Sequence, residues 1–103
     1  MKLKNPQGGG GGGLALTRIK SNQVLVGALD GINKDFTTPH KFVLDIAAGV
    51  EPIFKRNGQT IYLGKEIERL YESGGVGTGY DAAEFKKAPK IEDVLTADYI
   101  SLI

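Results

Sequence analysis

Apolar and polar positions alternate over short stretches, a pattern that predicts β-strands rather than helices along most of the chain. The clearest pair lies between Val50 and Leu63, where Asn57-Gly58 supplies the two positive-φ residues of a type I′ hairpin turn. The turn sets the register, in which Arg56 faces Gln59, Lys55 faces Thr60, Phe54 faces Ile61, Ile53 faces Tyr62 and Pro52 faces Leu63.

This register separates the two faces of the hairpin. The face expected to point into the core carries Val50, Pro52, Phe54, Ile61 and Leu63. Ile53 and Tyr62 form an apolar pair on the opposite face, which indicates that something covers that face as well. Pro52 indicates a free edge, because proline cannot donate a ladder hydrogen bond.

Further short segments have strand character and are bounded by glycine or proline. Residues 65–73 fit either a helical stripe or a strand, and the β-rich surroundings favour a strand. The other segments are 24–26, 36–38, 41–44, 80–86 and 94–103, the last with Leu95, Ala97 and Tyr99 on one side. The expected fold class is all-β, a small antiparallel β-sandwich or barrel of about six to eight short strands. The expected core includes Phe36, Phe42, Phe54, Phe85 and Tyr99.

A run of six glycines, Gly8 to Gly13, predicts a flexible N-terminal arm, because glycine loses the most backbone entropy on folding. The expected division is a Gly-rich basic arm at 1–20 and a β-rich assembly domain at 21–103. Two interpretations of the arm stay open: a disordered tail, or a tether that lets the next segment reach another subunit. On the second, the partner-binding residues are Leu14, Leu16, Arg18, Ile19 and Lys20.

The charge is distributed unevenly along the 103 residues. Residues 1–29 carry four basic side chains and no acid, 4 − 0 = +4, whereas residues 30–103 carry nine basic and 12 acidic side chains, 9 − 12 = −3. Four spaced cations without interleaved aromatic residues argue against nucleic-acid binding. A domain of this size has marginal stability by itself, so contact with neighbouring subunits would stabilise its folded state.

The chain lacks cysteine, which removes disulfides and thiolate metal sites. Its apolar runs fall far short of the roughly 20 residues that span a bilayer, and the N-terminus lacks the apolar region of a signal peptide. The sequence therefore predicts a soluble protein made in the cytoplasm, with no membrane partner.

The candidate chemistry is sparse. The loop Gly74 to Gly79 has neither a Rossmann context nor the Gly-Lys-Ser/Thr ending of a P-loop. His40 is the only histidine, and no serine has a nucleophile-elbow context. Because the acids are scattered, the sequence predicts a protein that is not an enzyme and has no cofactor, catalytic residue or metal site.

The order of several short motifs carries a family resemblance over about residues 27–103. The motifs are Asp30 to Pro39, Phe42-Val43, Asn57-Gly58-Gln59, Leu63-Gly64, Phe85, Ala88-Pro89, Asp93-Val94-Leu95 and Asp98-Tyr99-Ile100. This series resembles a small β-module of phage and prophage virion proteins, found in neck, capsid-decoration or tail-associated proteins. The sequence departs from the family's pattern after Leu63-Gly64, where this chain continues into Lys65-Glu66-Ile67.

The resemblance implies a bacteriophage virion structural protein that mediates particle assembly, at the head-tail junction or neck, as capsid decoration or on the tail. The expected partners are copies of itself in a ring or other oligomer and the portal, capsid or tail proteins. The expected location is the virion, after synthesis in the host cytoplasm. The alternative is a receptor- or carbohydrate-binding module of a tail fibre, with Tyr62, Tyr71 and Tyr80 as a stacking surface.

Overall fold

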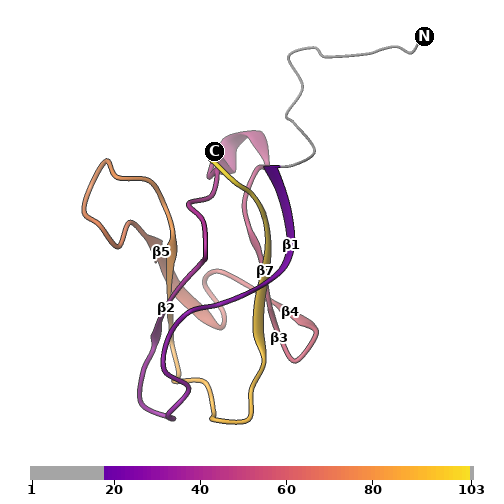
Figure 1. Ribbon diagram of the computed structural model, residues 1–103, viewed down its shortest axis with the longest axis vertical. Coiled ribbons are helices and arrows are strands. Elements are labelled where there is room, and N and C mark those ends of the chain that lie inside the picture. The colour runs from indigo at the N-terminus through magenta and orange to yellow at the C-terminus, as the bar shows by residue number, and fades with distance from the viewer. Residues whose placement is uncertain (1–17, 103) are drawn as a thin grey trace, which may run out of the picture.

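Seven β-strands build two antiparallel sheets in the computed structural model, which describes residues 18–102 (Figure 1). The first sheet has the order β1-β7-β3-β4, with β1 at Ile19–Val24, β7 at Leu95–Ile100, β3 at Ile53–Arg56 and β4 at Gln59–Ile61. The second has the order β2-β6-β5, with β2 at Asp35–Thr37, β6 at Ala82–Phe85 and β5 at Ile67–Tyr71. One 3-10 turn, η2 (Ile46–Ala48), precedes β3. The predicted all-β class is confirmed.

The β3–β4 hairpin forms as its turn chemistry predicts. Asn57 and Gly58 have φ angles of 55° and 82°, the left-handed values that a type I′ turn requires. Three predicted pairs are confirmed, Arg56 with Gln59, Lys55 with Thr60 and Phe54 with Ile61.

The chain departs from the predicted register after Ile61, where β4 ends. The Tyr62 carbonyl accepts hydrogen bonds from the backbone N–H groups of residues 65, 66 and 67, so the chain turns sharply into β5. This turn takes Leu63 away from the core, and its side chain is 43% exposed. The expectation that Leu63 lies on the core face is wrong for this reason, whereas Pro52, Phe54 and Ile61 are buried as expected.

Aromatic side chains fill the space between the sheets. All five predicted core aromatics are buried: Phe36, Phe42, Phe54, Phe85 and Tyr99. Phe36 meets Phe85 edge-on with ring centroids 5.5 Å apart, and Phe42 meets Phe54 edge-on at 6.3 Å. Such edge-to-face pairs stabilise a core beyond the area that they bury.

The edge strands of the two sheets adjoin one another on two sides of the molecule. β1 and β2 share one edge, where Val26, just after β1, bridges to Thr37. β4 and β5 share the other edge, where the turn after Tyr62 joins them and Leu63 bridges to Ile67. Figure 1 views the molecule with the β1–β2 edge in front and β3 and β4 behind.

β1 begins at Ile19, two residues before residue 21, where the assembly domain was expected to start. Ile19 pairs with Ile100 and Lys20 pairs with Tyr99, so both belong to the first sheet. The backbone N–H of Ser101 donates to the Arg18 carbonyl at 2.7 Å, which extends this contact by one residue. Leu14, Leu16 and the glycine run lie outside the described residues.

Candidate interaction surfaces

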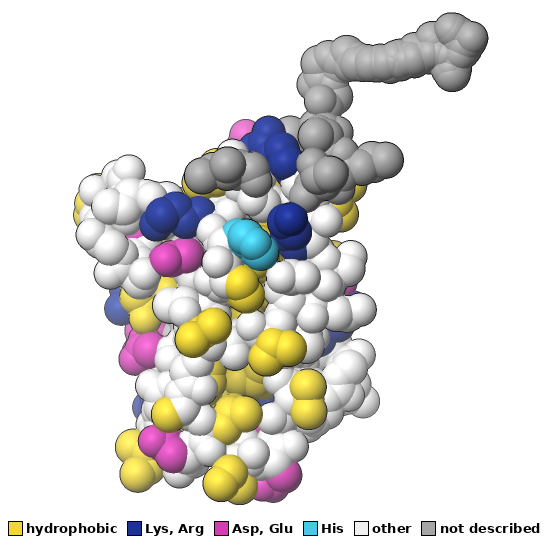
Figure 2. Space-filling view, viewed as in Figure 1, with side chains coloured by type: hydrophobic (Ala, Val, Ile, Leu, Met, Phe, Trp, Pro, Cys, Tyr) yellow, Lys and Arg dark blue, Asp and Glu magenta, His cyan; other side chains and the backbone are white. Residues whose placement is uncertain are grey.

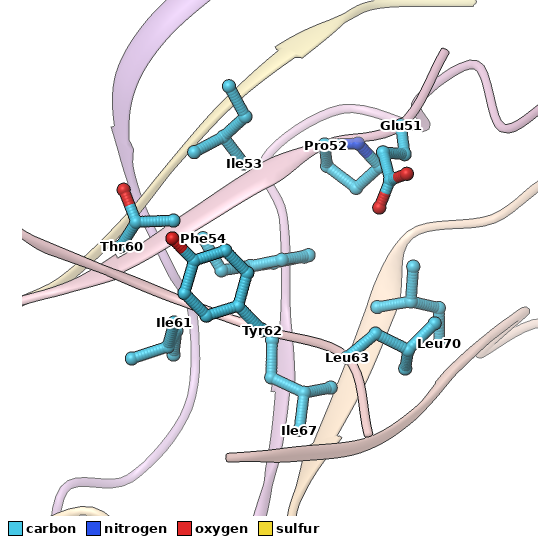
Figure 3. A pocket seen from close by; sticks show the side chains of 10 residues that line it. All are labelled: Glu51, Pro52, Ile53, Phe54, Thr60, Ile61, Tyr62, Leu63, Ile67 and Leu70. Atoms are coloured by element: carbon cyan, nitrogen blue, oxygen red, sulfur yellow. The ribbon is translucent and has the colours of Figure 1, made fainter. Parts of the chain in front are cut away.

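An apolar groove of 350 Å³ opens at the edge shared by β4 and β5. Figure 3 shows its walls, with Ile53 and Thr60 toward one side and Leu63 and Leu70 toward the other. We call it the β4–β5 groove, and it is lined by Glu51, Pro52, Ile53, Phe54, Thr60, Ile61, Tyr62, Leu63, Ile67 and Leu70. Both sheets therefore contribute to it.

Apolar side chains form both the floor and the rim of this groove. Phe54, Ile61 and Ile67 are buried core residues that reach its floor. On the rim, Ile53 is 47% exposed and Tyr62 is 56% exposed, together with the half-exposed Leu63. The sequence led us to expect a cover over Ile53 and Tyr62, and none of the described residues supplies one. Contiguous exposed apolar surface of this kind is typical of interaction sites.

Four cations surround a second hollow, of 340 Å³, that continues from the turn between β4 and β5. We call Arg56, Lys65, Lys86 and Lys87 the basic cluster. Among the described residues, none of the four has a carboxylate within 4.0 Å. Glu66 also lines this hollow, but its carboxylate accepts the Tyr62 N–H at 2.9 Å, and this hydrogen bond lowers the pKa of Glu66. Because this carboxylate stays ionised at neutral pH, the hollow has four cations and one anion, 4 − 1 = +3.

The opposite, β1–β2 edge has an apolar hollow of 210 Å³. We call it the β1–β2 hollow, and it is lined by Val24, Leu25, Leu29, Phe36, Asp93, Val94 and Leu95. Val24 and Val94 stand at its rim with 64% and 57% of their surface exposed. At the lower end of the face in Figure 2, hydrophobic side chains lie between acidic ones.

Acidic residues adjoin the lining of the β1–β2 hollow. We call Asp30, Glu92 and Asp93 the acidic rim, since Asp30 follows the lining residue Leu29 and Glu92 precedes Asp93. The N–H groups of Asn33 and Ile32 lower the pKa of the Asp30 carboxyl. The Asn57 amide and then the Lys90 N–H lower the pKa of Asp93. These two carboxylates are therefore ionised at neutral pH.

The predicted partner-binding residues fall into two groups. Arg18, Ile19 and Lys20 lie at the start of the first sheet, and the Arg18 guanidinium donates to the carbonyls of Ser101 at 3.0 Å and Leu102 at 2.9 Å. Leu14 and Leu16 lie outside the described residues.

In the glycine-rich loop between β5 and β6, two backbone N–H groups already donate hydrogen bonds to an acidic side chain of the same chain. The Glu72 carboxylate accepts the N–H groups of Gly77 at 3.0 Å and Gly79 at 2.8 Å. An anion bound there would compete with this carboxylate, so the loop is a poor phosphate cradle.

The other candidate for chemistry is His40, the single histidine of the sequence. His40 Nδ1 contacts the Tyr99 hydroxyl at 2.9 Å, and no acid completes a catalytic relay with it among the described residues. The part of the chain that the structure describes contains no group of three His, Cys, Asp or Glu side chains suited to a metal ion. Within residues 18–102, no helix has the length and apolar character needed to cross a membrane.

The three tyrosines of the alternative carbohydrate-binding interpretation have different surroundings. Tyr80 stacks on Phe42, with ring centroids 6.4 Å apart. Tyr71 lies under the Arg69 guanidinium at 4.2 Å and donates to Asp35 at 2.8 Å, and burial followed by this hydrogen bond raises the pKa of Tyr71 to about 12. Only Tyr62 lines the β4–β5 groove.

Sequence reasoning missed most of the groove, including Leu70 and the rim position of Leu63. The one signal that pointed to it was the apolar pair Ile53 and Tyr62 on the outer face of the hairpin. Comparison with models of known protein families, with curated proteins and with solved structures found no match.

Proposed function

We propose that the protein is a structural component of a bacteriophage virion that mediates particle assembly. The observation that carries this proposal is the β4–β5 groove, where three large apolar side chains on the rim stay about half exposed over a core-lined floor. Exposed apolar surface in a small soluble domain favours a protein partner, because association removes that surface from water.

The sequence supports a phage particle as the setting of this assembly. The ordered motifs from Asp30 to Ile100 resemble a virion β-module, and in this structure their residues contribute to the sheets, the hairpin and the edges. We place the protein at the head-tail junction or neck ahead of capsid decoration. Its partners are further copies of itself and portal, capsid or tail proteins, after synthesis in the host cytoplasm.

The five partner-binding residues predicted from the sequence have different roles in this proposal. Leu14 and Leu16 are proposed to contact a neighbouring protein in the particle. Arg18 is proposed to hold the start of β1 on the carbonyls after β7. Ile19 and Lys20 then contribute through the face and edge of β1.

Mass spectrometry of separated heads and tails tests the proposal. Particles grown in the host are purified and dissected, and the chain is quantified in each fraction against a known capsid protein. We expect a fixed stoichiometry in one fraction, the neck-containing one in the first instance. If the chain is absent from particles purified to constant composition, the virion function is wrong.

The same preparation distinguishes the tail-fibre alternative. A carbohydrate-binding module would be found with the fibres and would bind host surface glycans, and Tyr62→Ala would abolish that binding. For an assembly protein we expect no glycan binding and a reduced incorporation of Tyr62→Ala into particles.

A further inference from the structure

We infer that the protein assembles head to tail with further copies of itself, the β4–β5 edge of one copy contacting the β1–β2 edge of the next. This inference rests on the proposed assembly function and adds to it the partner of the groove and the two surfaces that meet.

The positions of the two surfaces determine the kind of assembly. β1 and β2 end the two sheets on one side, and β4 and β5 end them on the other. A contact between two different surfaces of the same chain leaves one free copy of each surface at the ends of a pair. Such a heterologous contact continues to add subunits until the rotation closes a ring.

Both edges carry unburied apolar surface, and each also has a hollow. The β4–β5 groove of 350 Å³ is rimmed by Ile53, Tyr62 and Leu63. The β1–β2 hollow of 210 Å³ is rimmed by Val24 and Val94. Contact between the edges would place the rim of each surface against the hollow of the other, which buries the apolar groups that water now covers.

Charge selects the head-to-tail contact over a contact between like edges. The basic cluster continues from the β4–β5 groove through Lys65, two residues after Leu63, and the acidic rim adjoins the β1–β2 hollow through Asp93. Within one chain, the charges of Arg56 and Lys90 already act on Asp93. Lys65, Lys86 and Lys87 are therefore the cations of the cluster that are left for a contact between copies. Pairing two β4–β5 edges would bring two basic clusters together, and pairing two β1–β2 edges would bring two acidic rims together. Like charges at an interface suppress the wrong pairing, whereas unlike charges set the orientation.

Mixing two edge variants of the full chain tests the inference by sedimentation. Tyr62→Asp places a charge in the β4–β5 groove, and Val94→Asp places one at the β1–β2 hollow. Each variant should sediment as a monomer at concentrations where the wild type forms oligomers. An equimolar mixture should form a one-to-one dimer, because each variant keeps the surface that the other has lost.

Val76→Asp is the matched control, since Val76 lies fully exposed in the loop between β5 and β6, away from both surfaces. It should form the same oligomers as the wild type. Leu63→Asp serves in place of Tyr62→Asp if that variant loses its cooperative unfolding transition, because Leu63 is also on the groove rim and outside the core.

Charge reversal tests the orientation separately. Lys87→Glu in the basic cluster and Glu92→Lys in the acidic rim are both on exposed residues. Each should weaken self-association by about two- to five-fold, as expected for one exposed ion pair. The double variant should recover most of this loss.

Three results would overturn the inference. One is a wild-type chain that stays monomeric at millimolar concentration. Another is a Val94→Asp variant that still dimerises, which indicates a like-edge contact through the β4–β5 groove. The third is a Val76→Asp control that dissociates as Tyr62→Asp does. A chain that passes the mixing test but is absent from particles contradicts the virion function and leaves the head-to-tail contact supported.

Discussion

Phe54 connects the core to the groove, because its ring packs edge-on against Phe42 and also reaches the groove floor. Phe54→Ala should lower the free energy of unfolding by about 3–5 kcal/mol, the usual cost of removing a buried aromatic ring. This cost approaches the whole stability of so small a domain, so little folded protein should remain. Chemical denaturation followed by circular dichroism measures the loss.

Ile53→Ala is the natural control for Phe54→Ala, since Ile53 is the adjacent residue on β3 and points to the other, half-exposed face. It should change the unfolding midpoint far less. A Phe54→Ala protein with the wild-type midpoint would show that the ring is not a core residue.

Asp98 on β7 joins the bulge in β1 to β3. Its carboxylate accepts the Asn22 N–H at 2.6 Å and the Lys55 ammonium at 2.8 Å. The Asn22 hydrogen bond first, and then Lys55, lower the pKa of Asp98 below its ordinary value of 3.8. A lowered pKa in the folded state means that this stabilisation is present above the unfolded value and is lost as the pH falls through the folded one.

Asp98→Asn should therefore cost about 1–2 kcal/mol at neutral pH, the scale of a hydrogen bond to a charged group. The difference from wild type should begin to shrink below about pH 4, where Asp98 takes up a proton in the unfolded chain but not in the folded one. It should be lost once the pH falls through the lowered pKa of the folded state. Denaturation midpoints across a pH series measure this. A difference that stays constant down to pH 2 would mean that the ionised carboxylate is not the cause.

The β3–β4 hairpin depends on a backbone conformation that only a few residues tolerate. A Cβ added at Gly58 would meet no atom within 4 Å, so the cost of substitution there comes from its φ of 82° and not from a steric clash. Gly58→Val should destabilise the protein by about 1–3 kcal/mol, the range for a non-glycine residue held in a strained conformation. Gly58→Asn should lose much less, since asparagine tolerates left-handed φ. Equal melting temperatures for the valine, asparagine and wild-type proteins would argue against the turn.

The hairpin was predictable because its turn residues are adjacent in the sequence and fix the register by themselves. The sharp turn after Tyr62 was not, because one carbonyl there accepts three N–H groups and no residue type marks this in advance. The core aromatics were found from their strand positions. β1 was only partly found, since its start is defined by pairing with β7 about 80 residues later.

The two surfaces could not be predicted from the sequence, because each combines residues that come together only in the folded chain. The groove brings Leu70 of the second sheet beside Pro52 of the first, and no local pattern links residues that far apart. The basic cluster likewise combines Arg56 of the hairpin with Lys86 and Lys87 after β6. Only Ile53 and Tyr62 gave a local signal, as an apolar pair on a face expected to be polar.

Two truncations of the N-terminus test two roles separately. One role is the stabilisation of the first sheet, and the other is the proposed contact of Leu14 and Leu16 with a neighbouring virion protein. β1 begins at Ile19, and Arg18 makes three hydrogen bonds to Ser101 and Leu102 just after β7. Deleting residues 1–20 removes these bonds and the pairs of Ile19 and Lys20 with β7. We expect a loss of about 2–4 kcal/mol in the free energy of unfolding.

Deleting residues 1–17 is the matched control, since this shorter deletion keeps Arg18 and the whole of β1. The unfolding midpoint should stay near wild type, and head-to-tail oligomers should form because both edges are intact. Incorporation into particles should fall, because Leu14 and Leu16 are the proposed contacts with neighbouring virion proteins, and exposed charges alone contribute little affinity. Full incorporation of the 1–17 deletion would remove the two leucines from the proposal, and an unfolded 1–17 deletion would show that the first sheet needs residues before Arg18.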